Sequence, residues 1–278
     1  MKYITRKSLL YKTGVEYGDY TINHIEGCSH GCNYPCYAML LSKRFGRVKN
    51  YNEWLEPKLV SNSIELLQKE LPRLKKDIES VHLCFMSDPF MYGYPEISDM
   101  SLDIIKLINS FGIKVTTLTK GQYPADLLKF GNHPDNEYGI SFVSNNTEFL
   151  NKYEPYSLNW DQRIEQLQKI SKSGAKTWVS MEPYPTPNIV TQNLTELLKI
   201  VSFTNKIIFG RLNYNGLISQ FENYKEFYND CCQIVSDFCQ SNRIEYHIKE
   251  GTYCVPCPVR VSILNSYKKS FINSRYGN

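Results

Sequence analysis

The sequence predicts an α/β protein that forms a partial (β/α)6 TIM-like barrel. The chain has 278 residues, of which 42% are hydrophobic and 22% charged, and this is enough for one barrel-sized core. Short apolar and β-branched runs alternate along it with segments of helical apolar spacing. Such alternation favours a parallel sheet with right-handed crossovers, and about six units follow the first strand.

The predicted strands are short runs rich in β-branched, aliphatic and aromatic residues. In chain order they cover residues 20–25, 81–86, 113–118, 138–143, 176–181, 206–209 and 244–248. The first of them leads directly into a loop rich in cysteine.

The predicted helices lie between these strands and repeat apolar residues at intervals of three and four. They cover residues 37–41, 58–79, 98–110, 124–129, 158–172, 190–201 and 218–239. Pro72 should break or kink the second helix, because proline removes a backbone donor. No linker rich in Gly, Ser or Pro divides the chain, so we assign residues 1–250 to the barrel and residues 251–278 to an irregular C-terminal extension.

The loop after the first strand carries three of the nine cysteines, Cys28, Cys32 and Cys36. Glycine and proline between them allow the backbone to turn, so that the three thiols can converge on one metal centre. Structural zinc normally takes four protein ligands, whereas an iron–sulfur cluster held by three cysteines leaves one iron open. The spacing therefore favours a reactive cluster, with zinc binding or incidental cysteines as the alternative.

Residues 27–37 resemble the cluster loop of the radical S-adenosylmethionine (SAM) superfamily, in particular its spore photoproduct lyase-like branch, which reads Gly-Cys-x-x-x-Cys-x-aromatic-Cys-Tyr. The last gap departs from that pattern, because Pro35 is inserted between Tyr34 and Cys36. The resemblance implies a 4Fe-4S cluster on the three cysteines and SAM chelated to the open iron. It also implies reductive cleavage of SAM to a 5'-deoxyadenosyl radical, hydrogen abstraction from a substrate, and an electron donor such as flavodoxin or ferredoxin.

Polar side chains follow several predicted strands, at the edge where the active site of a parallel barrel lies. The same branch has Ser-Asp after the second strand, Thr-Lys after the third and Ser on the fourth, and this chain matches it. The resemblance thus assigns SAM binding to Ser87, Asp88, Lys120 and Ser141, with Glu182 and residues 210–213 as further candidates. Tyr34 and Tyr37 flank the third cysteine, where they could contact the cluster or the adenine or simply pack.

Phe85 occupies a position at which spore photoproduct lyases carry a cysteine that returns a hydrogen atom to the product radical. Strand alternation would then turn Cys84 toward the helices as a small buried side chain. This argues against thymine-dimer reversal and leaves SAM cleavage untouched, and no catalytic residue is assigned.

We expect His30 to be exposed.

Cys254 and Cys257 form a CxxC pair that could bind a second metal with Cys231, Cys232 and Cys239. The last three lie on a predicted helix, where several can instead face the core.

The net charge of +4 permits a nucleic-acid partner without requiring one. Basic residues interleaved with aromatic ones, as on nucleic-acid surfaces, occur at residues 43–51 and 267–276. Such runs are more often solvated surface, but the resemblance to the spore photoproduct lyase-like branch implies a DNA or RNA base as the substrate, and this is our leading hypothesis. The alternatives are a radical SAM enzyme acting on a peptide or small metabolite, and a non-catalytic metal-binding module.

No apolar run is long enough to cross a bilayer, and the N-terminus lacks the apolar core of a signal peptide. The odd number of cysteines and their metal-like spacing favour a reducing compartment over disulfides. We expect a cytoplasmic protein without a membrane partner.

Overall fold

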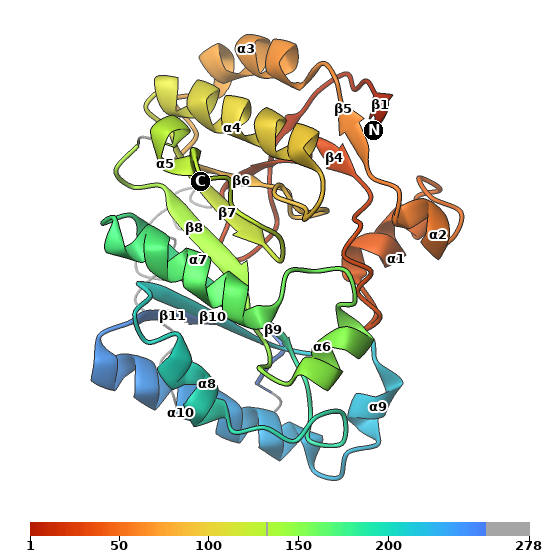
Figure 1. Ribbon diagram of the computed structural model, residues 1–278, viewed down its shortest axis with the longest axis vertical. Helices are drawn as coiled ribbons and strands as arrows, with labels where there is room; N and C mark the ends of the chain where they lie inside the picture. Colours follow the sequence, from red (N-terminus) through yellow and green to blue (C-terminus); the bar gives the residue numbers. More distant parts are fainter. Residues whose placement is uncertain (132, 254–278) are drawn as a thin grey trace, which may run out of the picture.

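The computed structural model describes residues 1–131 and 133–253, and its main feature is a curved sheet of eight strands (Figure 1). The strand order is β11-β10-β9-β8-β7-β6-β3-β2. Neighbouring strands are parallel except at the β2–β3 pair. Since β2 and β11 are the two edges, the barrel is open, as predicted. Cys254, Cys257 and the basic residues at 267–276 lie outside the described residues.

The strands of this sheet follow one another in chain order from β6 to β11, so each new strand lies beside the previous one. They are β2 (Leu10–Lys12), β3 (Tyr20–Ile22), β6 (Ser80–Leu83), β7 (Lys114–Thr119), β8 (Glu137–Ser141), β9 (Lys176–Tyr184), β10 (Lys206–Arg211) and β11 (Glu245–Ile248). A second sheet has the order β1-β5-β4, with β1 (Lys2–Ile4), β4 (Ile25–Glu26) and β5 (Lys58–Val60). The second sheet was not predicted.

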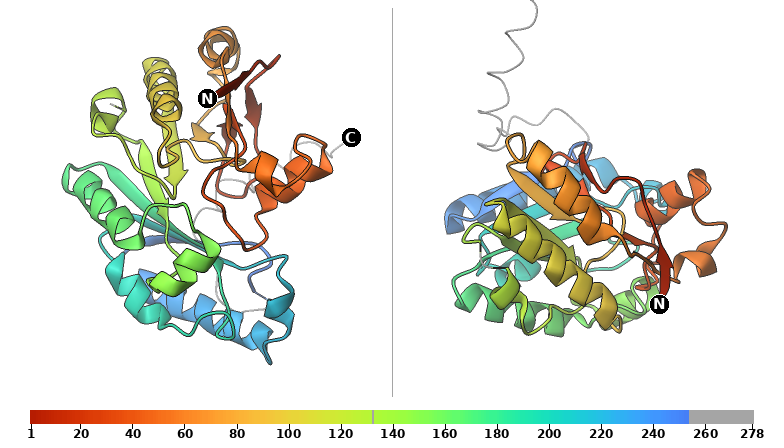
Figure 2. Two further views of the ribbon diagram at one scale, coloured as in Figure 1. Left: turned by 45° about the vertical axis from the view of Figure 1, so that its right-hand side comes forward. Right: turned by 90° about the horizontal axis from the view of Figure 1, so that it is seen from above.

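The longer helices cover the outer face of the large sheet (Figure 2). The helices are α1 (Tyr37–Arg44), α2 (Tyr51–Trp54), α3 (Ser63–Leu74), α4 (Pro95–Ser110), α5 (Leu127–Phe130), α6 (Thr147–Tyr153), α7 (Trp160–Lys172), α8 (Leu194–Ile200), α9 (Gly216–Ser219) and α10 (Tyr224–Asn242). Strand residues such as Val115, Ile140 and Val179 face these helices and are completely buried in the main apolar core. Among the described residues, no helix is both long and apolar enough to cross a membrane.

Several boundaries differ from the prediction. Helix α3 begins at Ser63, because the preceding residues form β5, and it continues past Pro72 to Leu74. Proline is tolerated there since it removes only one hydrogen bond in the last turn. The predicted helix 218–239 is divided into α9 and α10, and Asn223 lies between them in the left-handed region with φ 58°. Helix α6 was not predicted.

The strand predicted at 81–86 ends at Leu83, because Cys84 has a positive φ of 66°. This left-handed residue interrupts the regular alternation of side chains that an extended strand would give. As a result both Cys84 and Phe85 border the interior of the partial barrel. Cys84 is buried, as expected, and it packs against a small apolar cluster that includes Ile25 and Leu59.

Candidate functional site

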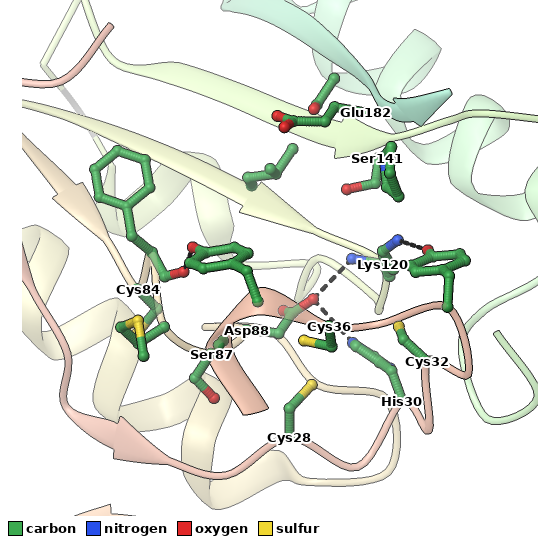
Figure 3. Close-up of a pocket in the computed structure, with 18 of the residues that line it drawn as sticks. Cys28, His30, Cys32, Cys36, Cys84, Ser87, Asp88, Lys120, Ser141 and Glu182 are labelled. Atoms are coloured by element: carbon green, nitrogen blue, oxygen red, sulfur yellow. Dashed lines mark hydrogen bonds and ion pairs between the residues drawn. The ribbon is translucent and has the colours of Figure 1, made fainter. Parts of the chain in front are cut away.

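A cavity of about 290 Å³ opens at the carboxyl ends of the parallel strands. All ten site residues predicted from the sequence line it: Cys28, Cys32, Tyr34, Cys36, Tyr37, Ser87, Asp88, Lys120, Ser141 and Glu182. The cysteine loop forms one wall (Figure 3), and the ends of β6 to β11 with residues of the segment between β2 and β3 form the others. Residues far apart in the sequence thus meet around one space.

The cysteine loop runs from β4 to α1 and presents three free thiols to the cavity. Gly27 has φ +91°, and a Cβ there would lie 2.8 Å from the backbone oxygen of Trp54, so only glycine fits. Burial raises the pKa of the Cys28 thiol, and raises that of Cys32 to about 12. Metal binding would release the protons of these two thiols, because the thiolate is the ligand.

The donor set of the loop fits an iron–sulfur cluster. No three His, Cys, Asp or Glu side chains within the described part of the chain are placed to hold a single metal ion. A four-iron cluster is larger, and each cysteine binds a different iron atom. Cys28, Cys32 and Cys36 would supply three such ligands, all from one loop.

Asp88 connects the cysteine loop to two strand ends (Figure 3). Its Oδ1 accepts hydrogen bonds from the Phe90 N–H at 2.8 Å and the Thr119 hydroxyl at 2.7 Å. Its Oδ2 accepts from the Lys120 backbone N–H at 2.7 Å and lies 2.8 Å from Nε2 of His30. Burial would raise the pKa of Asp88, but His30 and the other donors hold it below its usual value. Asp88 therefore holds the cysteine loop and the end of β7 together, and both of its oxygens have all their acceptor positions occupied.

His30 lies inside the cysteine loop and is 1% exposed, so our expectation of an exposed side chain was wrong. The hydrogen bond between its Nε2 and Asp88 explains its burial, because a buried polar ring requires a partner. Ser87 holds the same loop by donating its hydroxyl to the Gly27 carbonyl. The Ser-Asp pair after β6 therefore fixes the cysteine loop at two points.

Lys120, at the end of β7, pairs with a carboxylate that the sequence analysis missed. Its Nζ lies 2.5 Å from Oε1 of Glu154 and also donates to the Tyr34 hydroxyl, which itself donates to Glu154. Oε2 of Glu154 lies 2.7 Å from Nη2 of Arg163, an ion pair without hydrogen-bond alignment. Burial would raise the pKa of Glu154, but Lys120 and Arg163 hold it well below its usual value.

The sequence contains one signal for this cluster. Arg163 lies on the same face of α7 as Leu167 and Ile170, so a charged residue interrupts an apolar stripe that faces the core. A buried arginine requires an anionic or carbonyl partner. Glu154 follows α6 in an irregular segment, where no periodic pattern predicts its burial.

The wall opposite the cysteine loop also carries charged groups. Nζ of Lys249 lies 2.9 Å from Oε1 of Glu182, and Nε of Arg211 donates to the Asn213 side chain at 2.9 Å. Burial raises the pKa of Glu182 even though Lys249 acts against it. The ring of Tyr17 closes this side and lies under the Lys249 ammonium at 5.8 Å from its centroid.

Known proteins resemble this chain in sequence and in fold. The Radical SAM superfamily model matches residues 22–199, more than half of the chain. The uncharacterized protein MJ0683 of Methanocaldococcus jannaschii is 25% identical over 242 residues, which cover 84% of this chain and 86% of that protein.

Solved structures agree with this assignment at the level of the fold. Spore photoproduct lyase complexed with dinucleoside spore photoproduct superposes with a TM-score of 0.67 at 13% identity, over 88% of this chain and 80% of that one. A variant of the same lyase with bound AdoMet gives a TM-score of 0.65 over the same shares at 13% identity. A radical SAM methyltransferase from Sphaerobacter thermophilus gives 0.52 at 12% identity, over 84% and 67%. The chain therefore belongs to the radical SAM superfamily and is a radical SAM enzyme built on a partial barrel.

Proposed function

We propose that the protein cleaves SAM reductively at a 4Fe-4S cluster bound by Cys28, Cys32 and Cys36, and that it abstracts hydrogen from a nucleic-acid base. The observation that carries this proposal is the convergence of three free thiols and the polar strand ends on one cavity. When bound, the cluster and SAM supply the 5'-deoxyadenosyl radical on which the superfamily depends. An electron donor such as flavodoxin or ferredoxin would reduce the cluster.

The protein's own residues would bind and orient SAM. Lys120 presents a cation that suits the carboxylate of SAM, and the Ser141 hydroxyl and the Glu182 carboxylate suit its polar groups. Tyr34 and Tyr37 flank the third cysteine, and the Tyr37 hydroxyl donates to the Phe85 carbonyl. The walls of the cavity would exclude water from a reactive intermediate.

A basic segment beside the cysteine loop supports a nucleic-acid substrate. Helix α1 begins directly after Cys36, and Lys43, Arg44 and Arg47 are exposed at and beyond its C-terminal end. Phe45 is 66% exposed, and the Arg47 guanidinium lies over its ring at 5.9 Å. Cations next to an exposed aromatic ring suit a single-stranded nucleic acid, which binds through its phosphates and stacked bases. Phe85 leaves no cysteine at the hydrogen-return position, so we do not propose thymine-dimer reversal.

The wall opposite the loop favours a second substrate class. The Lys249–Glu182 ion pair and Arg211 offer charges of both signs to a ligand inside the cavity. Such an arrangement suits a charged peptide or small metabolite better than a neutral base. Salt-dependent binding of oligonucleotides separates the two classes, because only a polyanion releases many counterions.

The test of SAM cleavage uses anaerobically purified protein with a reconstituted cluster. We expect iron and sulfide in the protein and release of 5'-deoxyadenosine from SAM under dithionite. A C28A/C32A/C36A variant should bind no cluster and release none, because it lacks all three ligands. A protein that binds zinc, or binds iron yet never cleaves SAM, would instead favour the metal-binding module.

A further inference from the structure

Glu154 is a carboxylate behind the cavity wall, and its side chain is completely buried. A charge in such a place is costly unless cations and hydrogen-bond donors surround it. Here Lys120 approaches Oε1, Arg163 approaches Oε2, and the Tyr34 hydroxyl donates to Oε1. The three partners come from the end of β7, from α7 and from the cysteine loop. One carboxylate therefore joins three parts of the site.

Arg163 is a rigid support for this carboxylate. Its Nε donates to the Leu158 carbonyl at 2.7 Å, and its Nη1 donates to the Ser141 carbonyl at 3.0 Å. Its Nη2 donates to the Ser157 hydroxyl and lies beside Glu154. The side chain is 2% exposed, and these bonds fix the plane of the guanidinium. Arg163 thus holds Glu154 against the end of β8, where Ser141 lies.

Lys120 is constrained by the same carboxylate. A lysine ammonium has three N–H donors, and two of them reach Glu154 and the Tyr34 hydroxyl. The third donor remains for a ligand in the cavity that Lys120 lines. A free lysine side chain samples many rotamers, and fixing it in advance removes that entropy cost from ligand binding.

We infer that Glu154, supported by Arg163, is a positioning residue that fixes the Lys120 ammonium for the carboxylate of SAM. The inference rests on the proposed function, because it takes SAM as the ligand of Lys120. Glu154 acts through Lys120 and does not itself touch the ligand. The Tyr34 hydroxyl, hydrogen-bonded to both residues, places the fixed ammonium beside the cysteine loop.

A double-mutant cycle tests this role. SAM affinity is measured by calorimetry on cluster-reconstituted protein without reductant, for the wild type, E154Q, K120M and E154Q/K120M. We expect E154Q to weaken SAM binding about tenfold, since the released lysine must be ordered again. The double variant should bind no more weakly than K120M, because Glu154 has no effect once Lys120 is absent. The inference would be overturned if the fold-losses of SAM affinity in E154Q and K120M multiplied in the double variant. It would also be overturned if E154Q bound SAM at least as tightly as the wild type.

Two further variants keep this test interpretable. E154Q leaves Lys120 and Arg163 facing each other, so it could unfold, and E154Q/R163M removes the second buried charge as well. The latter should show the same loss of SAM affinity as E154Q. E165Q is the matched control, because Glu165 lies on the exposed face of α7 and pairs only with Lys169 among the described ion pairs. It should bind SAM as the wild type does.

A readout without cofactor separates this inference from the proposed function. In cluster-free protein, an amine-directed acylating reagent is followed at Lys120 by peptide mass spectrometry. We expect Lys120 to react several times faster in E154Q than in the wild type, and equally slowly in E165Q. Equal rates in E154Q and the wild type would refute the positioning role. If the wild type binds no SAM, the proposed function fails, while these rates still decide whether Glu154 fixes Lys120.

Discussion

His24 is a buried residue whose protonation state follows from its neighbours. The Ser101 hydroxyl donates to the Pro89 carbonyl at 2.7 Å, so Nε2 of His24, 2.8 Å away, must donate to Ser101. Nδ1 then accepts from the Cys84 thiol at 3.3 Å. A second proton on this ring would face the thiol hydrogen in a site without water access. Burial accordingly lowers the pKa of His24 to about 3.

This burial predicts an acid-sensitive fold. The pKa of His24 is about 3 when folded and about 6.5 when unfolded, so below pH 6.5 the unfolded chain binds the extra proton. The free energy of unfolding should therefore fall as the pH falls, by about 1 kcal/mol between pH 6.5 and 5.5 for His24 alone. In urea denaturation, H24Q should lose correspondingly less stability over this interval. H133Q, at a partly exposed histidine, should follow the wild type; an H24Q curve parallel to the wild type would contradict the assignment.

The cysteine loop is part of residues 27–57, the segment that connects strands β4 and β5. These two strands pair with each other at the two ends of the segment. Ile25 pairs with Leu59 and Glu26 with Lys58, and the Cys28 N–H donates to the Trp54 carbonyl at 2.9 Å. These strands are two and three residues long. Alternation of buried and exposed side chains cannot be recognised over so few residues. We therefore predicted residues 58–60 as part of the following helix. The three-cysteine motif was predicted from the sequence. The β4–β5 pairing and the hydrogen bond between Cys28 and Trp54 were not.

The basic segment at the end of α1 predicts salt-dependent binding of single-stranded oligonucleotides. If Arg44 and Arg47 each contact one phosphate, R44A/R47A should bind more weakly at low salt. The slope of log affinity against log salt should also become shallower by about 1.4, or 0.7 per lost contact. Affinities from fluorescence anisotropy at several salt concentrations give this slope. K169A/K172A, on α7, is the control, and identical slopes for both double variants would favour the small-metabolite class.

At the scale of the whole molecule, the barrel was predictable because strand and helix patterns alternate over most of the chain. The polar strand ends were also predictable, since parallel strands bring their carboxyl ends to one edge. The segment that crosses the open side of the barrel, residues 13–19, could not be predicted. Residues 13–19 have no regular period, yet Tyr17 packs its ring against Phe85, Trp178 and His247 inside the barrel. Such contacts depend on the tertiary structure and leave no local pattern.

Glu16 anchors this crossing segment to the far edge of the sheet. Its Oε2 lies 2.7 Å from Nε2 of His247 on β11, and it accepts the Glu250 N–H at 3.0 Å. Because Glu16 links this segment to β11 and to Glu250, E16A should free residues 13–19 locally while the helices on the outer face stay protected. Amide hydrogen exchange should accelerate at least tenfold in residues 13–19 and remain unchanged in α4 and α7. E222A, at an exposed glutamate before α10, should leave all three regions unchanged. Exchange in E16A that matches the wild type would mean that other contacts, such as those of the Tyr17 ring, hold residues 13–19 in place.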